Sequence, residues 1–233
     1  MFFLRSFMTS EELQLVSEKI SHFNDFVSLL RGLPYDRLPG LEAQLKLAPI
    51  NRKQEIISLG KGKNAVKSAV LFLFYPDENG HPSTVFIKRP EYNGAHSGQI
   101  SFPGGRYETT DPSLEYTALR ETHEEIGVPV SDIEVVGKLS DLFIPPSNYI
   151  VSPYIGITRE RPAFKADPLE VAAILEIELS DFFQTANCRT KELVLIGGYR
   201  LQTPCFEING HTIWGATAMM VSEFLEFVGR QLR

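Results

Sequence analysis

The apolar positions from Leu13 to Leu30 recur at alternating steps of three and four residues. This period predicts one amphipathic helix over residues 10–31, with Thr9 and Glu12 at capping-box spacing before it and Gly32 after it. Residues 34–65 show no comparable period, and we interpret them as a connecting segment with one short strand at 55–58. The residues that carry the helical period are Leu13, Val16, Ile20, Phe23, Val27 and Leu30.

Beyond Lys67 the pattern changes to short apolar runs separated by turn residues. The unbroken run Ala69–Tyr75 predicts a buried strand, and an Asn-Gly turn leads into a second strand. Strands and helices mix without strict alternation, which favours an α+β fold with a mixed sheet over a Rossmann fold. The predicted strands are 69–75, 84–88, 133–136, 150–157, 193–196, 199–201 and the hairpin 206–214. The predicted helices are 112–126 and an amphipathic helix at 216–228, and 171–177 is either a strand or a short helix.

Composition and charge limit the kinds of partner that we expect. The formal net charge is −6 and 43% of residues are hydrophobic, which indicates a globular domain without bulk attraction to nucleic acid or anionic membranes. The two cysteines, Cys188 and Cys205, lack metal-ligand spacing, and no apolar run is long enough for a transmembrane helix. Because no signal peptide is expected either, we predict a cytoplasmic protein.

The candidate chemistry lies in the helix predicted at 112–126. Glu121, Glu124 and Glu125 fall at positions i, i+3 and i+4, so their carboxylates share one helical face and repel one another. Without a function, the three glutamates would form an acidic helix face exposed to solvent. The glycine turn at Gly104-Gly105 upstream and Arg120 beside the glutamates favour instead a site for Mg²⁺ or Mn²⁺, which prefer oxygen ligands.

The stretch from Gly105 to Val128 resembles the signature motif of the Nudix hydrolase family. The residues that match are Arg120, Glu121, Glu124, Glu125, Gly127 and Val128. The first acid of the motif is Asp111 here, one extra residue separates it from Arg120, and Thr122 stands at an apolar position. Because Asp111 precedes Pro112 at the expected start of the helix, we interpret it as an N-cap and not as a metal ligand.

The resemblance extends upstream to the coenzyme A pyrophosphatase branch of that family. Arg89, Gly98 and Phe102-Pro103-Gly104-Gly105 match the pattern of the branch, whereas Ile87, Pro90 and Gly94 do not. Lys88 or Arg106 would replace the arginine that the branch carries at position 94. Residues 213–218 are also similar to the branch.

The resemblance implies a Nudix fold, in which a mixed sheet lies between helices, and a domain division into 1–65 and 66–233. The N-terminal helix would then pack on the domain or help to build a homodimer. The implied reaction is metal-dependent hydrolysis of the diphosphate of coenzyme A or acyl-CoA to 3′,5′-ADP and 4′-phosphopantetheine. The other readings are a diphosphatase acting on ADP-ribose or NADH, and a catalytically silent nucleotide-binding module.

By the resemblance, Glu124 and Glu125 are metal ligands, Glu121 is a ligand or the general base, and the Gly105 carbonyl adds a backbone ligand. Arg120 would orient the carboxylates. Glu170, from outside the motif, is either a further acidic ligand or base or an ordinary exposed glutamate. Each remaining candidate has both a functional and a structural interpretation. Arg89 either contacts phosphate or forms an ion pair at the end of a strand, and His96 either contacts substrate or stabilises its loop. Trp214 either packs in the core or stacks on a base.

Overall fold

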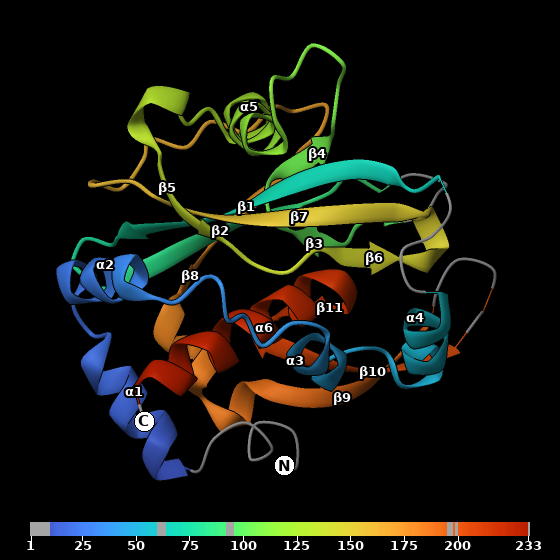
Figure 1. Ribbon diagram of the computed structural model, residues 1–233, viewed down its shortest axis with the longest axis horizontal. Helices are drawn as coiled ribbons and strands as arrows, with labels where there is room; N and C mark the ends of the chain where they lie inside the picture. Colours follow the sequence, from blue (N-terminus) through green and yellow to red (C-terminus); the bar gives the residue numbers. More distant parts are fainter. Residues whose placement is uncertain (1–9, 60–63, 92–95, 195–197, 199, 233) are drawn as a thin grey trace.

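The computed structural model describes residues 10–59, 64–91, 96–194, 198 and 200–232. The layers, from top to bottom of Figure 1, are helix α5, a large mixed sheet, helix α6 and a small antiparallel sheet. The described helices are α1 (Ser10–Lys19), α2 (Phe23–Gly32), α3 (Leu41–Lys46), α4 (Lys53–Leu59), α5 (Leu114–Ile126) and α6 (Gly215–Gln231), with short 3₁₀ turns that include η2 (Ile50–Arg52) and η4 (Pro145–Ser147). The α+β class and the mixed sheet expected from the sequence are confirmed.

The large sheet has the strand order β3-β2-β1-β7-β5, with β4 added to β1, β6 to β7 and β8 to β2. Only β1 and β7 pair in parallel; the other pairs are antiparallel. The strands are β1 (Val66–Pro76), β2 (Pro82–Lys88), β3 (Ile100–Ser101), β4 (Gly104–Arg106), β5 (Glu134–Lys138), β6 (Leu142–Ile144), β7 (Tyr149–Ile157) and β8 (Ala173–Glu178). The stretch 171–177, left open between strand and helix, is therefore a strand from Ala173 onward.

The central strand β1 is apolar throughout because both of its faces are covered. Leu71 and Leu73 belong to the core under α5, whereas Phe72 and Phe74 point to α6. On that second face, the Phe224 ring of α6 lies 4.8 Å from Phe72 and 5.0 Å from Phe74, measured between ring centroids. Because side chains of β1 alternate between its two faces, the same strand packs against α5 on one face and against α6 on the other.

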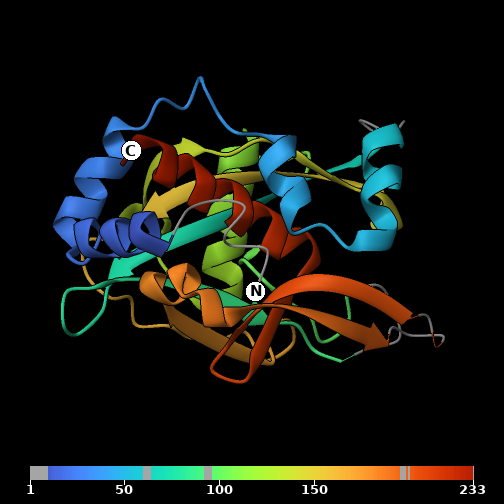
Figure 2. The ribbon, with the colours of Figure 1, turned by 90° about the horizontal axis from the view of Figure 1, so that it is seen from below.

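The small sheet places α6 in the interior of the molecule. It consists of β9 (Cys188–Val194), β10 (Arg200–Ile208) and β11 (His211–Trp214), and it lies on the side of α6 away from the large sheet (Figures 1 and 2). The hairpin around Asn209-Gly210 is as predicted. The expectation that α6 is amphipathic is wrong, because residues 217–229 are buried on all sides.

Two further expectations for the N-terminal part of the chain are wrong. The single helix over 10–31 is two helices, α1 and α2, because the chain turns at Ile20 and the backbone N–H of Phe23 donates to the carbonyl of Gly80. Residues 55–58, expected as a strand, belong to α4, and four residues are too few for a period to separate strand from helix. Thr9, the expected cap, lies outside the described residues.

Residues before β1 are tied to the rest of the fold by a buried carboxylate. Glu223 of α6 is fully buried and accepts hydrogen bonds from Gln44 Nε2 (2.8 Å), from the backbone N–H of Gly40 (3.1 Å) and from that of Ser140 (3.2 Å). Helix α3 therefore lies along α6 (Figure 2). None of the helices in the described part of the chain is long and apolar enough to cross a membrane.

Candidate functional site

The turn before the glutamate helix is anchored in the core by an aromatic residue. Phe102 is buried, with its ring centroid 4.8 Å from that of Phe86 and 4.3 Å from that of Phe72. Gly104, at φ +146°, pairs with Val70 of β1, and a Cβ there would lie 2.4 Å from the carbonyl oxygen of Ala69. Only glycine fits so close to β1 at this φ.

Helix α5 begins later than the sequence suggested. Ser113, not Asp111, is the N-cap, and its hydroxyl accepts a hydrogen bond from the N–H of Tyr116. The helix ends as expected at Gly127, whose φ of +76° is the left-handed conformation typical of a C-cap glycine. The interpretation of Asp111 as a cap is therefore wrong, and its carboxylate has another partner.

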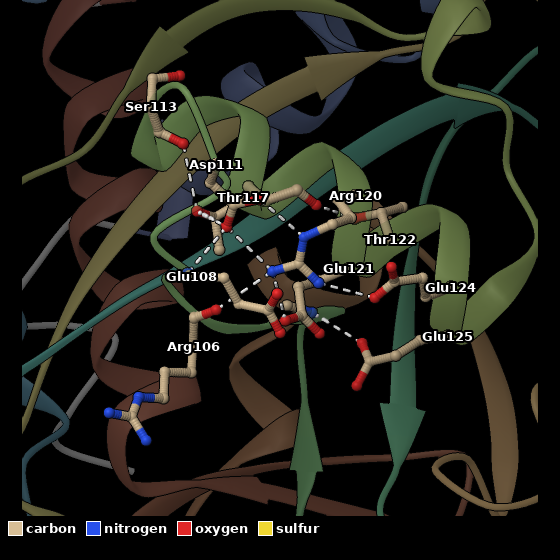
Figure 3. Close-up of polar contacts among 12 residues, drawn as sticks. Arg106, Glu108, Asp111, Ser113, Thr117, Arg120, Glu121, Thr122, Glu124 and Glu125 are labelled. Carbon is tan, nitrogen blue, oxygen red and sulfur yellow. Dashed lines mark hydrogen bonds and ion pairs between the residues drawn. The ribbon is translucent and has the colours of Figure 1, made fainter.

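That partner is Arg120, which lies between Asp111 and the glutamates (Figure 3). Its Nε donates to Asp111 Oδ1 at 2.9 Å, and its Nη2 lies 3.1 Å from Oδ2, so the pair is bidentate. Hydrogen bonds from Thr117 and from the Glu108 N–H complete the surroundings of Asp111. The hydrogen bonds from Arg120 hold the pKa of Asp111 well below its usual range, at about 2.

The other side of the guanidinium faces the carboxylates. Nη2 of Arg120 lies 3.0 Å from Glu121 Oε1, Nη1 donates to Glu124 Oε2 at 2.8 Å, and the Arg106 carbonyl accepts a further bond at 3.2 Å. These contacts raise the pKa of Arg120 above its ordinary value, with the hydrogen bond to Asp111 as the largest cause. Arg120 is therefore held by protein oxygens on several sides, between Asp111 and the glutamates.

Three carboxylates converge beside this network: those of Glu121, Glu125 and Glu170 each place an oxygen within 4.8 Å of the others. Glu170 comes from outside the helix. Its loop is attached to the end of α5, because the N–H of Lys165 donates to the Ile126 carbonyl and that of Asp167 to the Glu125 carbonyl, both at 2.9 Å. Glu170 itself is exposed, and it places a carboxylate oxygen beside those of Glu121 and Glu125.

Glu124 lies apart from that cluster. Its side chain is 52% exposed and faces Arg120, whereas Glu125 is buried and accepts a hydrogen bond from the N–H of Gly104 at 2.8 Å. The expectation that all three helix glutamates converge thus applies here to Glu121 and Glu125. Figure 3 shows Glu124 on the Arg120 side and Glu125 turned towards the glycine turn.

Gly105 leaves room for the Glu121 carboxylate. A Cβ at position 105 would lie 2.4 Å from the Glu121 Cδ, which is far inside van der Waals contact. The glycine pair therefore has two separate tasks: Gly104 allows the close approach to β1 and donates to Glu125, and Gly105 makes space for Glu121.

Burial raises the pKa values of Glu121 and Glu125. Desolvation raises the pKa of Glu125 to about 8, against the hydrogen bond from Gly104 and the charge of Arg89, which lower it. Desolvation also raises the pKa of Glu121, while Arg120 opposes this shift. Carboxylates that are partly deprived of water and close to one another favour a bound cation, because it offsets both costs.

The glutamates open into a cavity of about 1330 Å³. All the predicted substrate-contacting residues line it: Lys88, Arg89, His96 and Arg106. The Nε of Arg89 is buried and lacks a hydrogen-bond partner among the described residues. His96 is engaged through Nδ1 with the Gln99 side chain at 3.0 Å, as a loop-stabilising histidine would be. Position 94 lies outside the described residues.

The cavity floor crosses the large sheet from the glutamates to β6. Arg106, Ser68, Val151 and Leu142 lie in register on β4, β1, β7 and β6, and all four line the cavity. From β4 to β6 the floor thus spans three strand spacings, which is roughly 14 Å. Sequence reasoning did not identify this extension, nor the lining residues Arg52 and Ile56 from the N-terminal segment. Their only signal in the sequence is the basic stretch Asn51-Arg52-Lys53.

Comparison with known proteins agrees with this architecture. The family model described as the NUDIX domain matches residues 66–174. Nudix hydrolase NudL of Yersinia pestis (strain Pestoides F), itself uncharacterized, is 32% identical over 148 residues, which cover 63% of this chain and 73% of the relative. The chain therefore belongs to the Nudix hydrolase family.

Solved structures with partial similarity include two proteins described as Nudix proteins. One is a MutT/nudix family protein from Enterococcus faecalis, with 14% identity and a TM-score of 0.46 over 79% of this chain and 70% of that one. The other is the NUDIX domain of Shewanella oneidensis NrtR in complex with ADP ribose, with 20% identity and a TM-score of 0.42 over 56% of this chain and 86% of that one.

Proposed function

We propose that this Nudix hydrolase cleaves the diphosphate of coenzyme A or an acyl-CoA, giving 3′,5′-ADP and 4′-phosphopantetheine or its acyl derivative. The observation that carries the proposal is a cluster of carboxylates and cations in a cavity that extends over apolar residues of β7 and β6. A typical ligand pocket measures about 300–1,000 Å³, so about 1330 Å³ leaves room beyond a nucleotide.

The carboxylate cluster fits Mg²⁺ or Mn²⁺. Glu121, Glu125 and Glu170 supply hard oxygen donors within 4.8 Å of one another, and burial makes an uncompensated charge on Glu125 costly. We propose these three residues and the Gly105 carbonyl as ligands, and keep Glu124 as a further candidate. When bound, the divalent cation would neutralise charge on the diphosphate and lower the pKa of a water molecule.

The chain's own residues have defined tasks in this proposal. Arg120 keeps Glu121 in place through the ion pair at 3.0 Å, and Asp111 keeps Arg120 in place. Arg89, whose Nε has no partner among the described residues, is the first candidate for a contact to the diphosphate, and Lys88 and Arg106 contribute positive charge along the same wall. Glu121 serves as a ligand or as the general base that takes the proton of the attacking water.

The apolar part of the cavity supports the choice of coenzyme A. Beyond Ser68 the floor continues through Val151 and Leu142 to the residues of β6 and η4, and Ile56 of α4 also lines the cavity. A pantetheine arm and an acyl chain are long and largely uncharged, so they match such a surface better than a second phosphate or a sugar does. The segment that carries Arg52 and Ile56 would then form part of the substrate site and not of a separate unit.

Product analysis tests the proposal. The protein is incubated with Mg²⁺ and, separately, with coenzyme A, decanoyl-CoA, ADP-ribose or NADH, and products are identified by mass spectrometry, with Glu125→Gln as the inactive control. We expect 3′,5′-ADP from the first two substrates. Turnover of ADP-ribose or NADH alone would replace the proposed substrate, and tight nucleotide binding without any turnover would indicate a silent binding module.

A further inference from the structure

Trp214, for which the sequence left open a place in the core or stacking on a base, lies in the wall of the cavity. It is the last residue of β11 and directly precedes α6. The indole is half-buried, lines the cavity and belongs to neither of the two apolar core clusters. Among the described residues, no aromatic ring packs against it. A large apolar ring is thus left facing the space where the substrate would bind.

The alternation of β11 explains why the ring faces that way. Ile213 is fully buried in the core, and its neighbours Thr212 and Trp214 point to the opposite side of the strand, where both line the cavity. The orientation of Trp214 is therefore set by the burial of Ile213 and by the pairing of Trp214 with Cys205 on β10.

The Trp214 end of α6 lies at the cationic end of the cavity. The hydroxyl of Thr217, in the first turn of α6, donates to the Ile100 carbonyl at 2.9 Å, and Ile100 pairs with Lys88 on β2. Arg89 follows Lys88 and is joined to the same loop, because its N–H donates to the Gln99 carbonyl at 3.0 Å. The start of α6, which Trp214 directly precedes, is thus joined through Ile100 to the end of β2, where Lys88 and Arg89 lie.

We propose that Trp214 stacks on the nucleobase of the substrate. A base next to a phosphate held by Lys88 and Arg89 would lie at this end, while the uncharged remainder of the substrate would extend across the sheet towards β6. Stacking on an aromatic ring needs only the π-face of the base. The inference rests on the proposed nucleotide substrate class, but not on coenzyme A as its particular member.

Trp214 is the only tryptophan of the chain, so its fluorescence reports directly on the proposed contact. We would titrate the protein, with Mg²⁺ present, with ADP and separately with pyrophosphate, which has phosphates but no base. ADP should quench the emission with saturation, and pyrophosphate should bind without comparable quenching. Equal quenching by both, or saturable ADP binding by calorimetry without a change in emission, would overturn the proposal.

Substitution provides the second measurement. Trp214→Leu should raise KM for the turned-over nucleotide by roughly 5- to 100-fold, the range expected for one base stack, with a smaller effect on kcat. Trp214→Phe should recover part of the loss. The matched control is Tyr116→Leu, which removes an exposed aromatic ring of α5 that does not line the cavity. An unchanged KM in a folded Trp214→Leu protein would contradict the stack.

The outcomes separate this inference from the proposed function. ADP-dependent quenching without hydrolysis of coenzyme A would leave the stack in place and remove the substrate assignment. Hydrolysis of coenzyme A without any change in Trp214 fluorescence on ADP binding would support the substrate assignment and remove the stack.

Discussion

Arg120 and Asp111 form a bidentate ion pair across the loop that precedes α5, with Nε 2.9 Å from Oδ1 and Nη2 3.1 Å from Oδ2. Both side chains are largely buried, with exposed fractions of 17% and 1%. The pair connects the start of the helix to the residue that contacts Glu121 and Glu124. Asp111 is thereby a positioning residue for the glutamates and not a helix cap.

Asp111→Asn should therefore weaken both stability and turnover. The amide cannot accept two charge-assisted bonds from the guanidinium, and the expected loss in free energy of unfolding is about 1.5–3 kcal/mol. Turnover should fall by roughly 10- to 100-fold, as for residues that support metal ligands. Chemical denaturation and steady-state kinetics would measure the two effects, with exposed Asp36→Asn as control. Unchanged turnover would show that the pair is structural only.

The stability contributed by this pair should disappear in acid. The folded-state pKa of Asp111, about 2, lies below the ordinary value of 3.8. A lowered carboxyl pKa stabilises the folded state above the unfolded-state value, and this contribution is lost as pH falls through the folded-state value. The difference in unfolding free energy between wild type and Asp111→Asn should thus be constant above pH ~5 and shrink between pH ~4 and ~2.

Gly105→Ala tests the space made for Glu121. The added methyl would meet the Glu121 carboxylate at 2.4 Å, so the carboxylate must leave its position. A displacement of this size should lower kcat on the order of 100-fold. Gly32→Ala is the matched control, because a Cβ there has no neighbour within 4 Å. Full activity in the Gly105 variant would mean that the position of Glu121 is not needed.

The two neighbouring glutamates should differ in their response to substitution. Glu125→Gln should reduce turnover by more than about 100-fold, since even residues that only support metal ligands typically cost about 10- to 100-fold. Glu124→Gln removes a half-exposed partner of Arg120, so a smaller loss is expected from this structure. Equal losses would indicate that Glu124 turns into the site when the cation binds. Circular dichroism would check the fold of both variants.

Cation binding should release a proton below pH ~8, because the pKa of Glu125 is raised to about 8 and the ligand must be ionised. Affinity for Mg²⁺ should therefore increase with pH and level off above that value. Calorimetry in buffers of different ionisation enthalpy would count the protons, and Glu125→Gln should abolish their release. EDTA should remove turnover, and Mg²⁺ should restore it. Proton release that persists in the variant would point to another group.

Some features of the site were predictable because their determinants are close together in the chain. The apolar run of β1, the glycine turn and the spacing of Glu121 and Glu125 each express a local period or a local φ requirement. The same local reasoning failed for Asp111, since an Asp-Pro pair before a helix is a good cap by propensity. An ion pair with a residue nine positions later leaves no periodic signal in the sequence. Here Asp111 pairs with Arg120 and does not cap the helix.

In the N-terminal segment, contacts with distant residues overrode the local apolar pattern. Its helical period continues through Ile20 into α2, yet the chain turns there because Phe23 is hydrogen-bonded to Gly80 of a distant turn. Residues 55–58 are too few for a period to separate strand from helix. Both outcomes depend on packing partners that the local pattern does not contain.

The sequence by itself determined the strand, the glycine turn and the helix that present the glutamates, because these follow from backbone geometry and apolar spacing within a few dozen residues. Only the tertiary structure decided that Glu170 joins Glu121 and Glu125, that Arg120 is held by Asp111, and that Trp214 faces the cavity. These relationships join residues that are distant in the chain, and they arise because burying one side of each element leaves the other side directed at a shared space.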